Sequence, residues 1–221
     1  MNSLKEVMQI FDKDHDCCNG NHEVKKIIVG IHGIKTKRDS WVDSFIAFSK
    51  TFFKDEHVLY VDYEYGYLSA ILCTLPFVKG YLVRAFKRKL RKLQKANPDA
   101  DLNIVGHSYG TEMTHIAVKT SGEDGGVLIK TDNIILVGSI LNVQTDLSQL
   151  FAKGQFNTFH VYSSLEDEVC RFNPFGHSGY MRLYDDFAIN HRHKKLEHGG
   201  YFTADFFRQW AEIFDLKERE L

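Results

Sequence analysis

The sequence has few of the features that mark secreted, membrane-spanning or disordered proteins. Its 221 residues include three prolines and four cysteines, and they contain no run of 18 apolar residues. Scarce proline with ordinary aromatic content argues against disorder, and the missing apolar run excludes a transmembrane helix by the usual criterion. The N-terminus lacks the basic start and apolar block of a secretory signal. The cysteines are too few and too scattered for a disulfide framework, so we expect a soluble, cytoplasmic protein with reduced thiols.

The chain also lacks an excess of charge of either sign. Its 28 lysines and arginines nearly balance 29 aspartates and glutamates, for a net charge of −1. This balance excludes a globally basic nucleic-acid binder, so no nucleic-acid partner is expected. A chain of this length buries about 70% of its unfolded surface, enough for one complete core. We therefore expect a short N-terminal helix and polar loop over residues 1–24, followed by one domain over residues 25–221.

Apolar segments of strand length alternate with segments of helical spacing. Strands are expected at residues 27–31, 58–61, 102–105, 134–137 and 159–162, with a last short strand at 181–184. Helices are expected at residues 3–13, 41–53, 67–95 (broken near Pro76), 111–119 and 203–216. Short apolar strands separated by helices predict an α/β fold, a three-layer α/β/α sandwich around a mostly parallel sheet.

Residues 106–110 form a Gly-x-Ser-x-Gly motif centred on Ser108. A predicted strand leads directly into it and a predicted helix follows directly, the setting that a nucleophile elbow requires. The flanking glycines permit a tight turn that lifts the hydroxyl above the sheet, and the helix N-terminus favours developing negative charge. We therefore predict that Ser108 is a nucleophile. The alternative is a glycine-rich turn with an incidental serine.

A serine hydroxyl needs a base to take its proton, and eleven histidines compete for this role. Chain order in this architecture is Ser, then Asp or Glu, then His, which leaves His177, His191, His193 and His198. His177 lies too close to the expected acid, and His191 and His193 stand among basic residues typical of a solvated stretch. His198, in a glycine-containing loop before the last helix, is the preferred base.

The strand at residues 159–162 leads into three acidic residues, Glu166, Asp167 and Glu168. A carboxylate just past the carboxyl end of a strand can hold the tautomer of the catalytic imidazole. We prefer Asp167, because Val169 two residues later is expected to anchor this loop in the core. Glu166 and Glu168 stay as alternatives.

An oxyanion site needs two backbone N–H donors. One is expected from Tyr109, directly after the serine, and the other from Ile34, in the loop after the first core strand. We expect His32, Gly33 and His107, which flank these groups, to contribute to substrate binding. Two similar segments are rejected: the His-Gly-Gly at residues 198–200 lies far after the serine, and no strand leads into Ser178.

These motifs together resemble the α/β-hydrolase superfamily of the lipase and esterase type. The resemblance rests on His32-Gly33, the motif at 106–110, the acidic segment at 167–169 and His198-Gly199, and it spans about residues 25–216. It implies hydrolysis of a carboxylic ester, from a small molecule or a lipid, through an acyl-enzyme, without metal or cofactor. The usual pair of strands before the first core strand is not evident, and only 17 residues, 142–158, separate the strands between which a large cap commonly inserts. We therefore expect a minimal fold without a large cap domain.

The same three catalytic groups also serve thioesterases, acyltransferases and peptidases, and the fold also occurs as a binding module without turnover. These functions stay open at the level of the sequence. Labelling by a fluorophosphonate separates an active serine from an inactive one, and panels of acyl chains and leaving groups separate the enzymes.

Three further patterns in the sequence are weaker signals of binding sites. Asp12, Asp14, Asp16 and Glu23 imitate a calcium loop, but Cys17 replaces the required glycine. Adjacent Cys17 and Cys18 are poorly spaced to chelate zinc together with His15 and His22, so a solvated loop is preferred.

Residues 79–95 carry eight basic side chains and no acidic one. They predict a surface helix, with peripheral contact to an anionic membrane as the sharper hypothesis, in which residues 67–78 form an acyl pocket or small lid.

Overall fold

The computed structural model describes residues 23–33, 41–54, 56–64, 75–123 and 125–219, and these ranges contain one six-stranded sheet. The strands are β1 (Lys26–Ile31), β2 (Val58–Tyr63), β3 (Asp101–His107), β4 (Asn133–Val137), β5 (Thr158–Ser164) and β6 (Ala188–His193). Their order is β2-β1-β3-β4-β5-β6, and every neighbouring pair is parallel. The predicted α/β class with a parallel sheet is confirmed.

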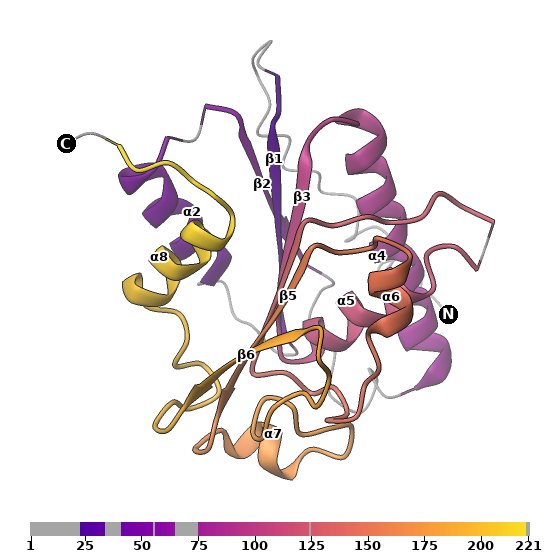
Figure 1. Ribbon diagram of the computed structural model, residues 1–221, viewed down its shortest axis with the longest axis vertical. Coiled ribbons are helices and arrows are strands. Elements are labelled where there is room, and N and C mark those ends of the chain that lie inside the picture. Colours follow the sequence, from indigo (N-terminus) through magenta and orange to yellow (C-terminus); the bar gives the residue numbers. More distant parts are fainter. Residues whose placement is uncertain (1–22, 34–40, 55, 65–74, 124, 220–221) are drawn as a thin grey trace, which may run out of the picture.

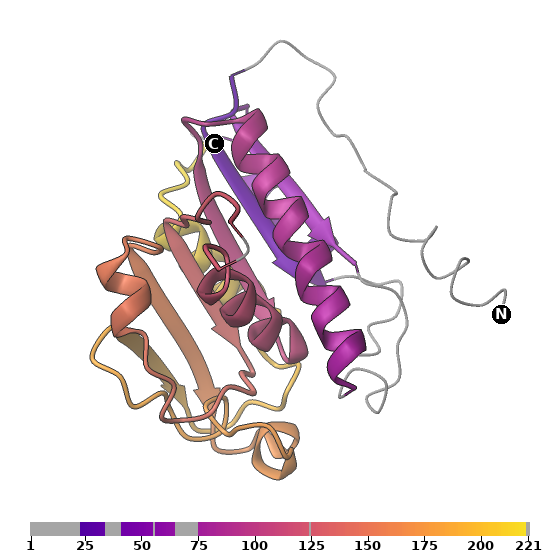
Figure 2. The same cartoon turned by 90° about the vertical axis from the view of Figure 1, so that its right-hand side faces the viewer.

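Helices cover both faces of this sheet. They are α2 (Trp41–Phe52), α4 (Pro76–Ala96), α5 (Tyr109–Lys119), α6 (Ser148–Ala152), α7 (Glu168–Phe172) and α8 (Ala204–Ile213). Helices α2 and α8 lie on one side of the sheet, and α4, α5 and α6 lie on the other (Figure 1). Figure 2 turns this second layer toward the viewer, with the long helix α4 in front of the sheet. The predicted three-layer sandwich is therefore confirmed.

Each face of the sheet has its own hydrophobic core. Toward α4 and α5, alternate residues of the central strands pack against Leu82, Phe86 and Leu90, which recur at helical spacing on α4. Toward α2 and α8, the core is rich in aromatic residues and includes Phe45 and Trp210. Burial on both faces explains why the central strands read as nearly continuous apolar runs. Each large side chain buried in this way contributes about 1.5–3 kcal/mol to folding.

The connection between β4 and β5 is short. Residues 138–157 are all described and contain α6 as their one helix. This agrees with the expected fold without a large cap at that position. No helix in the described ranges is both long enough and apolar enough to cross a bilayer.

Seven of the eight basic residues of α4 fall into two groups, and the eighth, Lys89, is half-buried. Lys79 pairs with Glu112, Lys87 is buried and donates to the Thr120 carbonyl oxygen at 3.3 Å, and Arg91 donates to the Val127 carbonyl oxygen at 3.1 Å. These side chains tie α4 to α5 and to the loop after it. A second group follows helical spacing on the solvent side of α4 and consists of Arg84, Arg88, Lys92 and Lys95.

Two expectations about the last part of the sheet were wrong. Residues 181–184 form no strand, and the last strand is β6 instead. The side-chain amide of Asn190 in β6 bonds to both main-chain groups of Leu183, so a side chain takes the place of a ladder. His191 and His193, read from the sequence as a solvated stretch, lie in this strand and stack on Tyr162.

Other expected elements fall partly or wholly outside the described residues. These are the helix at 3–13, the calcium-like and zinc-like residues of the N-terminal loop except Glu23, and the part of the expected 67–95 helix before Leu75. The separation of residues 1–24 from the main domain stays a prediction for the same reason.

The order of the strands fixes where a site can form. From β1 the chain moves to β2 at one edge and then returns to place β3 on the other side of β1. Ligands of open α/β sheets bind beyond the carboxyl ends of the strands at such a reversal. At this point β1 ends just before His32, and β3 ends at His107, directly before Ser108.

Candidate active site

Ser108 occupies a strained turn between β3 and α5. Its φ and ψ of 53° and −121° place a residue other than glycine in a region that costs about 1–3 kcal/mol to populate. The surrounding hydrogen bonds hold this conformation: the Ser108 amide donates to the Val137 carbonyl oxygen at 3.1 Å, and the Thr111 hydroxyl donates to the Ser108 carbonyl oxygen at 2.6 Å. The serine is partly exposed, so its hydroxyl is not sealed in the core.

The two glycines of the motif are required by close packing. A Cβ on Gly110 would stand 2.6 Å from the carbonyl oxygen of Ile31, because α5 begins against the end of β1. A Cβ on Gly106 would stand 3.1 Å from the carbonyl oxygen of Gly110. The motif therefore brings the first turn of α5 directly onto the strands beneath it.

Asp167 and His198 form a hydrogen-bonded pair, although 31 positions separate them. The Nδ1–H of His198 lies 2.9 Å from one carboxylate oxygen of Asp167 and 3.0 Å from the other. Asp167 is completely buried, and it caps α7 by accepting from the Cys170 amide at 2.8 Å. Burial alone would raise the pKa of Asp167, but the hydrogen bonds from His198 and Cys170 hold it below its ordinary value. An ionised carboxylate fixes the imidazole with its proton on Nδ1, which leaves Nε2 as a proton acceptor.

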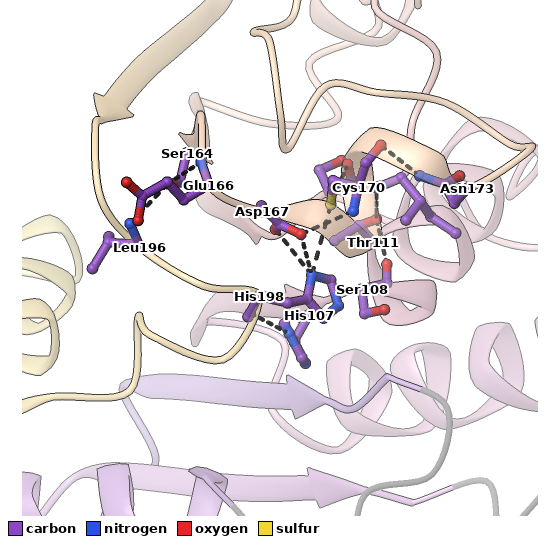
Figure 3. A network of polar contacts seen from close by, with 12 residues as sticks. His107, Ser108, Thr111, Ser164, Glu166, Asp167, Cys170, Asn173, Leu196 and His198 are labelled. Carbon is purple, nitrogen blue, oxygen red and sulfur yellow. Dashed lines mark hydrogen bonds and ion pairs between the residues drawn. The ribbon is translucent and has the colours of Figure 1, made fainter.

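Ser108 and His198 belong to the same cluster of side chains. In Figure 3 Ser108 is drawn beside the His198 ring, and Asp167 is drawn across the ring from it. His107, the neighbour of Ser108 in the chain, has its ring centroid 4.7 Å from that of His198. The structure thus pairs the predicted acid with the predicted base, and through His107 it places this pair next to the turn that carries Ser108, the predicted nucleophile.

His107 contacts the loop that carries the base. Its Nε2–H donates to the His198 carbonyl oxygen at 3.1 Å, and its ring packs edge-on against Phe202. Burial, with the nearby His198 as a second cause, lowers the pKa of His107 to about 3, so the ring is neutral. The expected contribution of His107 to substrate binding stays a prediction. Its hydrogen bond to the His198 carbonyl oxygen gives the side chain another role, which is to hold the loop that carries the base.

The end of β1 closes the other side of Ser108. A Cβ on Gly33 would stand 2.7 Å from Ser108 Cβ and 3.2 Å from its Oγ, so only glycine fits against the serine. His32 is buried and its Nε2 lies 2.7 Å from Asp62 Oδ1, a pairing that the sequence analysis missed. Tyr109 is the first residue of α5, where an amide points out of the helix, whereas Ile34 lies outside the described residues.

Further residues support the Asp167–His198 pair and were not identified from the sequence. Gly138, directly after β4, has a φ of 53°, and a Cβ there would stand 3.0 Å from His198 Nδ1. Cys170 is fully buried, and its Sγ lies 3.7 Å from the same nitrogen. Burial, with the Asp167 charge as a further cause, raises the pKa of the Cys170 thiol. In the sequence, the one sign that Gly138 matters was its position directly after the predicted strand at residues 134–137.

The reason given for preferring Asp167 was partly wrong. Val169, expected to anchor the loop, is 51% exposed, and the residue that enters the core is Cys170. The rival acids Glu166 and Glu168 are exposed.

The rejected alternatives make other contacts. His177 donates from Nδ1 to the Cys170 carbonyl oxygen at 2.8 Å, and the Ser178 hydroxyl is buried against that of Ser139. His191 and His193 belong to β6.

Comparison with known proteins shows similarity in structure and not in sequence. No protein-family model matches the chain, and no curated protein matches it by sequence. A product of the gene lin2722 of Listeria innocua has a TM-score of 0.58 at 13% identity, covering 86% of this chain and 94% of that one. A cold-adapted esterase from an Arctic intertidal metagenomic library has a TM-score of 0.55 at 11% identity, covering 87% and 84%. An esterase of the archaeon Pyrobaculum calidifontis has a TM-score of 0.52 at 13% identity, covering 89% and 77%.

The chain has the α/β-hydrolase fold. The structures above share its sheet and layers, and the predicted resemblance to this superfamily is thereby confirmed at the level of the fold. In this chain Ser108 stands on the strand–turn–helix segment between β3 and α5. At 11–13% identity the likeness in these three comparisons shows the fold alone and not the activity.

Proposed function

We propose that this protein is a serine hydrolase that cleaves a carboxylic ester through an acyl-enzyme. The single observation that carries this proposal is the hydrogen-bonded Asp167–His198 pair, packed against the elbow that presents Ser108. A buried carboxylate, an oriented imidazole and a partly exposed serine on a strained turn together supply an activated nucleophile. The esterase activity of structurally similar proteins agrees with this assignment.

In the first half of the reaction, His198 Nε2 takes the proton of the Ser108 hydroxyl as its oxygen attacks the acyl carbon. The tetrahedral oxyanion receives hydrogen bonds from the Tyr109 amide and, we propose, from the amide of Ile34. The intermediate then collapses, the bond to the alcohol breaks, and His198 returns the proton to the departing alkoxide. The products of this half are the free alcohol and an ester of Ser108.

In the second half, water replaces the alcohol. His198 Nε2 takes a proton from the water as its oxygen attacks the acyl carbon, and the second intermediate expels Ser108. The proton returns to the serine oxygen, and the carboxylic acid leaves. Asp167 stays ionised throughout and stabilises the imidazolium that forms twice in each cycle.

Labelling with a fluorophosphonate tests the activated serine directly. We expect the wild-type protein to be labelled at Ser108 and to hydrolyse short chromogenic esters. The Ser108→Ala variant should lose labelling and turnover, while its free energy of unfolding should change by no more than surface substitutions do, about 0.5 kcal/mol. Esterase activity retained in Ser108→Ala would refute the assignment.

Thioesterase, acyltransferase and peptidase activities use the same three residues and remain alternatives within this proposal. Matched oxygen esters, thioesters and amides with one acyl group separate them by kcat/KM. A protein that binds such compounds without reacting with the fluorophosphonate would be a binding module on a hydrolase fold.

We also propose that α4 meets anionic membrane surfaces. Of its eight basic side chains, those of Lys79, Lys87 and Arg91 contact α5 or the loop after it, that of Lys89 is half-buried, and four are exposed. The solvent-facing group on α4 consists of Arg84, Arg88, Lys92 and Lys95, and these four form the proposed contact.

A further inference from the structure

The proposed catalytic base belongs to a cluster of three side chains whose polar atoms suit a metal ion. A carboxylate oxygen of Asp167, Sγ of Cys170 and Nδ1 of His198 all lie within 4.8 Å of one another. Carboxylate, thiolate and imidazole are the three ligand types that zinc takes in proteins. Elsewhere in the described ranges no other three such side chains meet this closely.

The spacing of these atoms is close to that of a tetrahedral zinc site. Bond lengths of about 2.0–2.1 Å to nitrogen and about 2.3 Å to sulfur place two such ligands about 3.6 Å apart. Sγ of Cys170 lies 3.7 Å from Nδ1 of His198. Nδ1 and the Asp167 oxygen, now 2.9 Å apart across a hydrogen bond, need to separate by only about half an ångström around a metal.

A glycine packs against one side of the pair. Gly138 faces it, and a Cβ at this position would stand 3.0 Å from His198 Nδ1 and 3.3 Å from Asp167 Oδ2. A side chain at this position would therefore crowd Nδ1, where the proposed ion binds. His198 keeps 19% of its side chain exposed, whereas the side chain of Asp167 is fully buried.

Charge balance also favours a divalent ion here. Asp167 supplies one negative charge, and a thiolate at Cys170 supplies a second, so a divalent cation with a neutral imidazole makes a site of zero net charge. A neutral site avoids the large cost of burying an isolated ion.

We propose that Asp167, Cys170 and His198 form an inhibitory zinc site, in which the metal competes with the catalytic tautomer of His198. The ion binds Nδ1 of His198, Sγ of Cys170 and a carboxylate oxygen of Asp167. The thiol proton leaves to solvent, and the imidazole proton moves through solvent from Nδ1 to Nε2. An imidazole protonated at Nε2 cannot accept the Ser108 proton, so bound metal stops the reaction. The inhibition rests on the proposed hydrolase function, whereas the binding does not.

Cobalt provides a test of binding that needs no turnover. In a variant with Cys17, Cys18 and Cys73 changed to serine, Cys170 is the single cysteine. Titration with Co²⁺ should give a thiolate-to-cobalt charge-transfer band together with the intense visible bands of four-coordinate cobalt, and Zn²⁺ should abolish both. Cys170→Ser in this background should give no charge-transfer band. Absence of the band when Cys170 is present would overturn the proposed site.

Inhibition is the second measurement. Zn²⁺ should inhibit hydrolysis of a chromogenic ester, Mg²⁺ should not, and a chelator should restore activity, because thiolate and imidazole select zinc over magnesium. Each variant is compared with its own metal-free rate. Cys170→Ser should need roughly tenfold or more Zn²⁺ for half inhibition, since even changes outside the metal ligands cost about 10–100-fold in affinity.

A matched control addresses the other close pair of imidazoles. Nδ1 of His160 lies 2.9 Å from Nε2 of His191, so within the described ranges this pair is a competing site for zinc. The His191→Gln variant should keep full sensitivity to Zn²⁺. Equal sensitivity of Cys170→Ser and wild type, or loss of sensitivity in His191→Gln, would contradict the assignment. A cobalt band in a protein that hydrolyses no ester would keep the metal site and refute the proposed function.

Discussion

His107 illustrates how one side chain can hold both partners of the proposed reaction. It precedes Ser108 on the elbow, and its Nε2–H reaches the carbonyl oxygen of His198, 91 positions later in the chain. Its Nδ1 is buried and has no hydrogen-bond partner among the described residues. A neutral ring with its proton on Nε2 fits both facts, and it couples the position of the base to that of the nucleophile.

Replacing His107 by phenylalanine tests this coupling. The ring remains, but the donor to His198 is lost, so we expect kcat to fall by up to about 10²-fold because the base is displaced. KM should change little if the side chain positions His198 and makes no essential contact with substrate. His107→Gln, which keeps a donor, should recover part of the rate. A rise in KM with kcat unchanged would instead support the substrate-binding role expected from the sequence.

Among the secondary-structure elements, β6 and α7 show where sequence patterns fail to predict the structure. The inner strands were predictable because burial on both faces demands apolar residues, as in β4, where Ile134 to Val137 are all buried. Strand β6 is an edge strand whose residues are exposed or half-buried, so it has no run of apolar residues to mark it in the sequence. Helix α7 has five residues and is stabilised by the Asp167 cap, so its length hides it from any test of periodicity.

A chain of polar side chains explains why β6 nevertheless joins the sheet. The Asn133 amide donates to Asn103 at 2.8 Å, and the Thr158 hydroxyl donates to Asn133 at 2.6 Å. His160 continues the chain from Thr158 at 3.0 Å to His191 at 2.9 Å. Four strands are thus linked through their side chains. These contacts depend on tertiary register, so no local pattern in the sequence could reveal them.

Helix α4 carries the prediction for membrane contact. Each basic residue near an anionic surface contributes about 1 kcal/mol, so the double variant Arg84→Ala, Arg88→Ala should bind anionic vesicles roughly thirtyfold more weakly. Cosedimentation at low and high salt measures this, and binding should decline with salt. The matched control is Lys50→Ala, Arg208→Ala, which removes two exposed charges from α2 and α8 on the other layer. Equal binding to neutral and anionic vesicles would rule out this contact.

For the whole molecule, the parallel arrangement of the strands gathers the candidate site residues at one edge of the sheet. Ser108 follows β3, Gly33 follows β1, and Asp167 follows β5, so each reaches the same edge of the sheet. The sequence could supply this result because parallel strands present their carboxyl ends together. It could not supply the supporting contacts of Gly138 and Cys170, since these depend on how loops fold back after β4 and β5.

Buried histidines give the whole fold a dependence on pH. Burial, as the first cause in each case, lowers the pKa of His107 to about 3 and those of His115 and His160 to about 4. In the unfolded chain these groups have pKa values of about 6.5. Below that pH the unfolded chain binds protons that the folded protein rejects, so the free energy of unfolding decreases as the pH falls from about 6.5 toward 4.

The size of this effect follows from the number of protons. Each extra proton bound by the unfolded chain changes the free energy of unfolding by about 1.4 kcal/mol per pH unit, so three histidines give a slope of up to about 4 kcal/mol per unit near pH 5. Asp167, with its lowered pKa, adds to the loss of stability only at more acidic pH, whereas the raised pKa of Asp132 opposes it. Urea unfolding at pH 7, 6 and 5 measures the slope. His160→Gln should reduce it by about one proton, and a slope identical to that of the wild type would show that His160 is not buried in its neutral form.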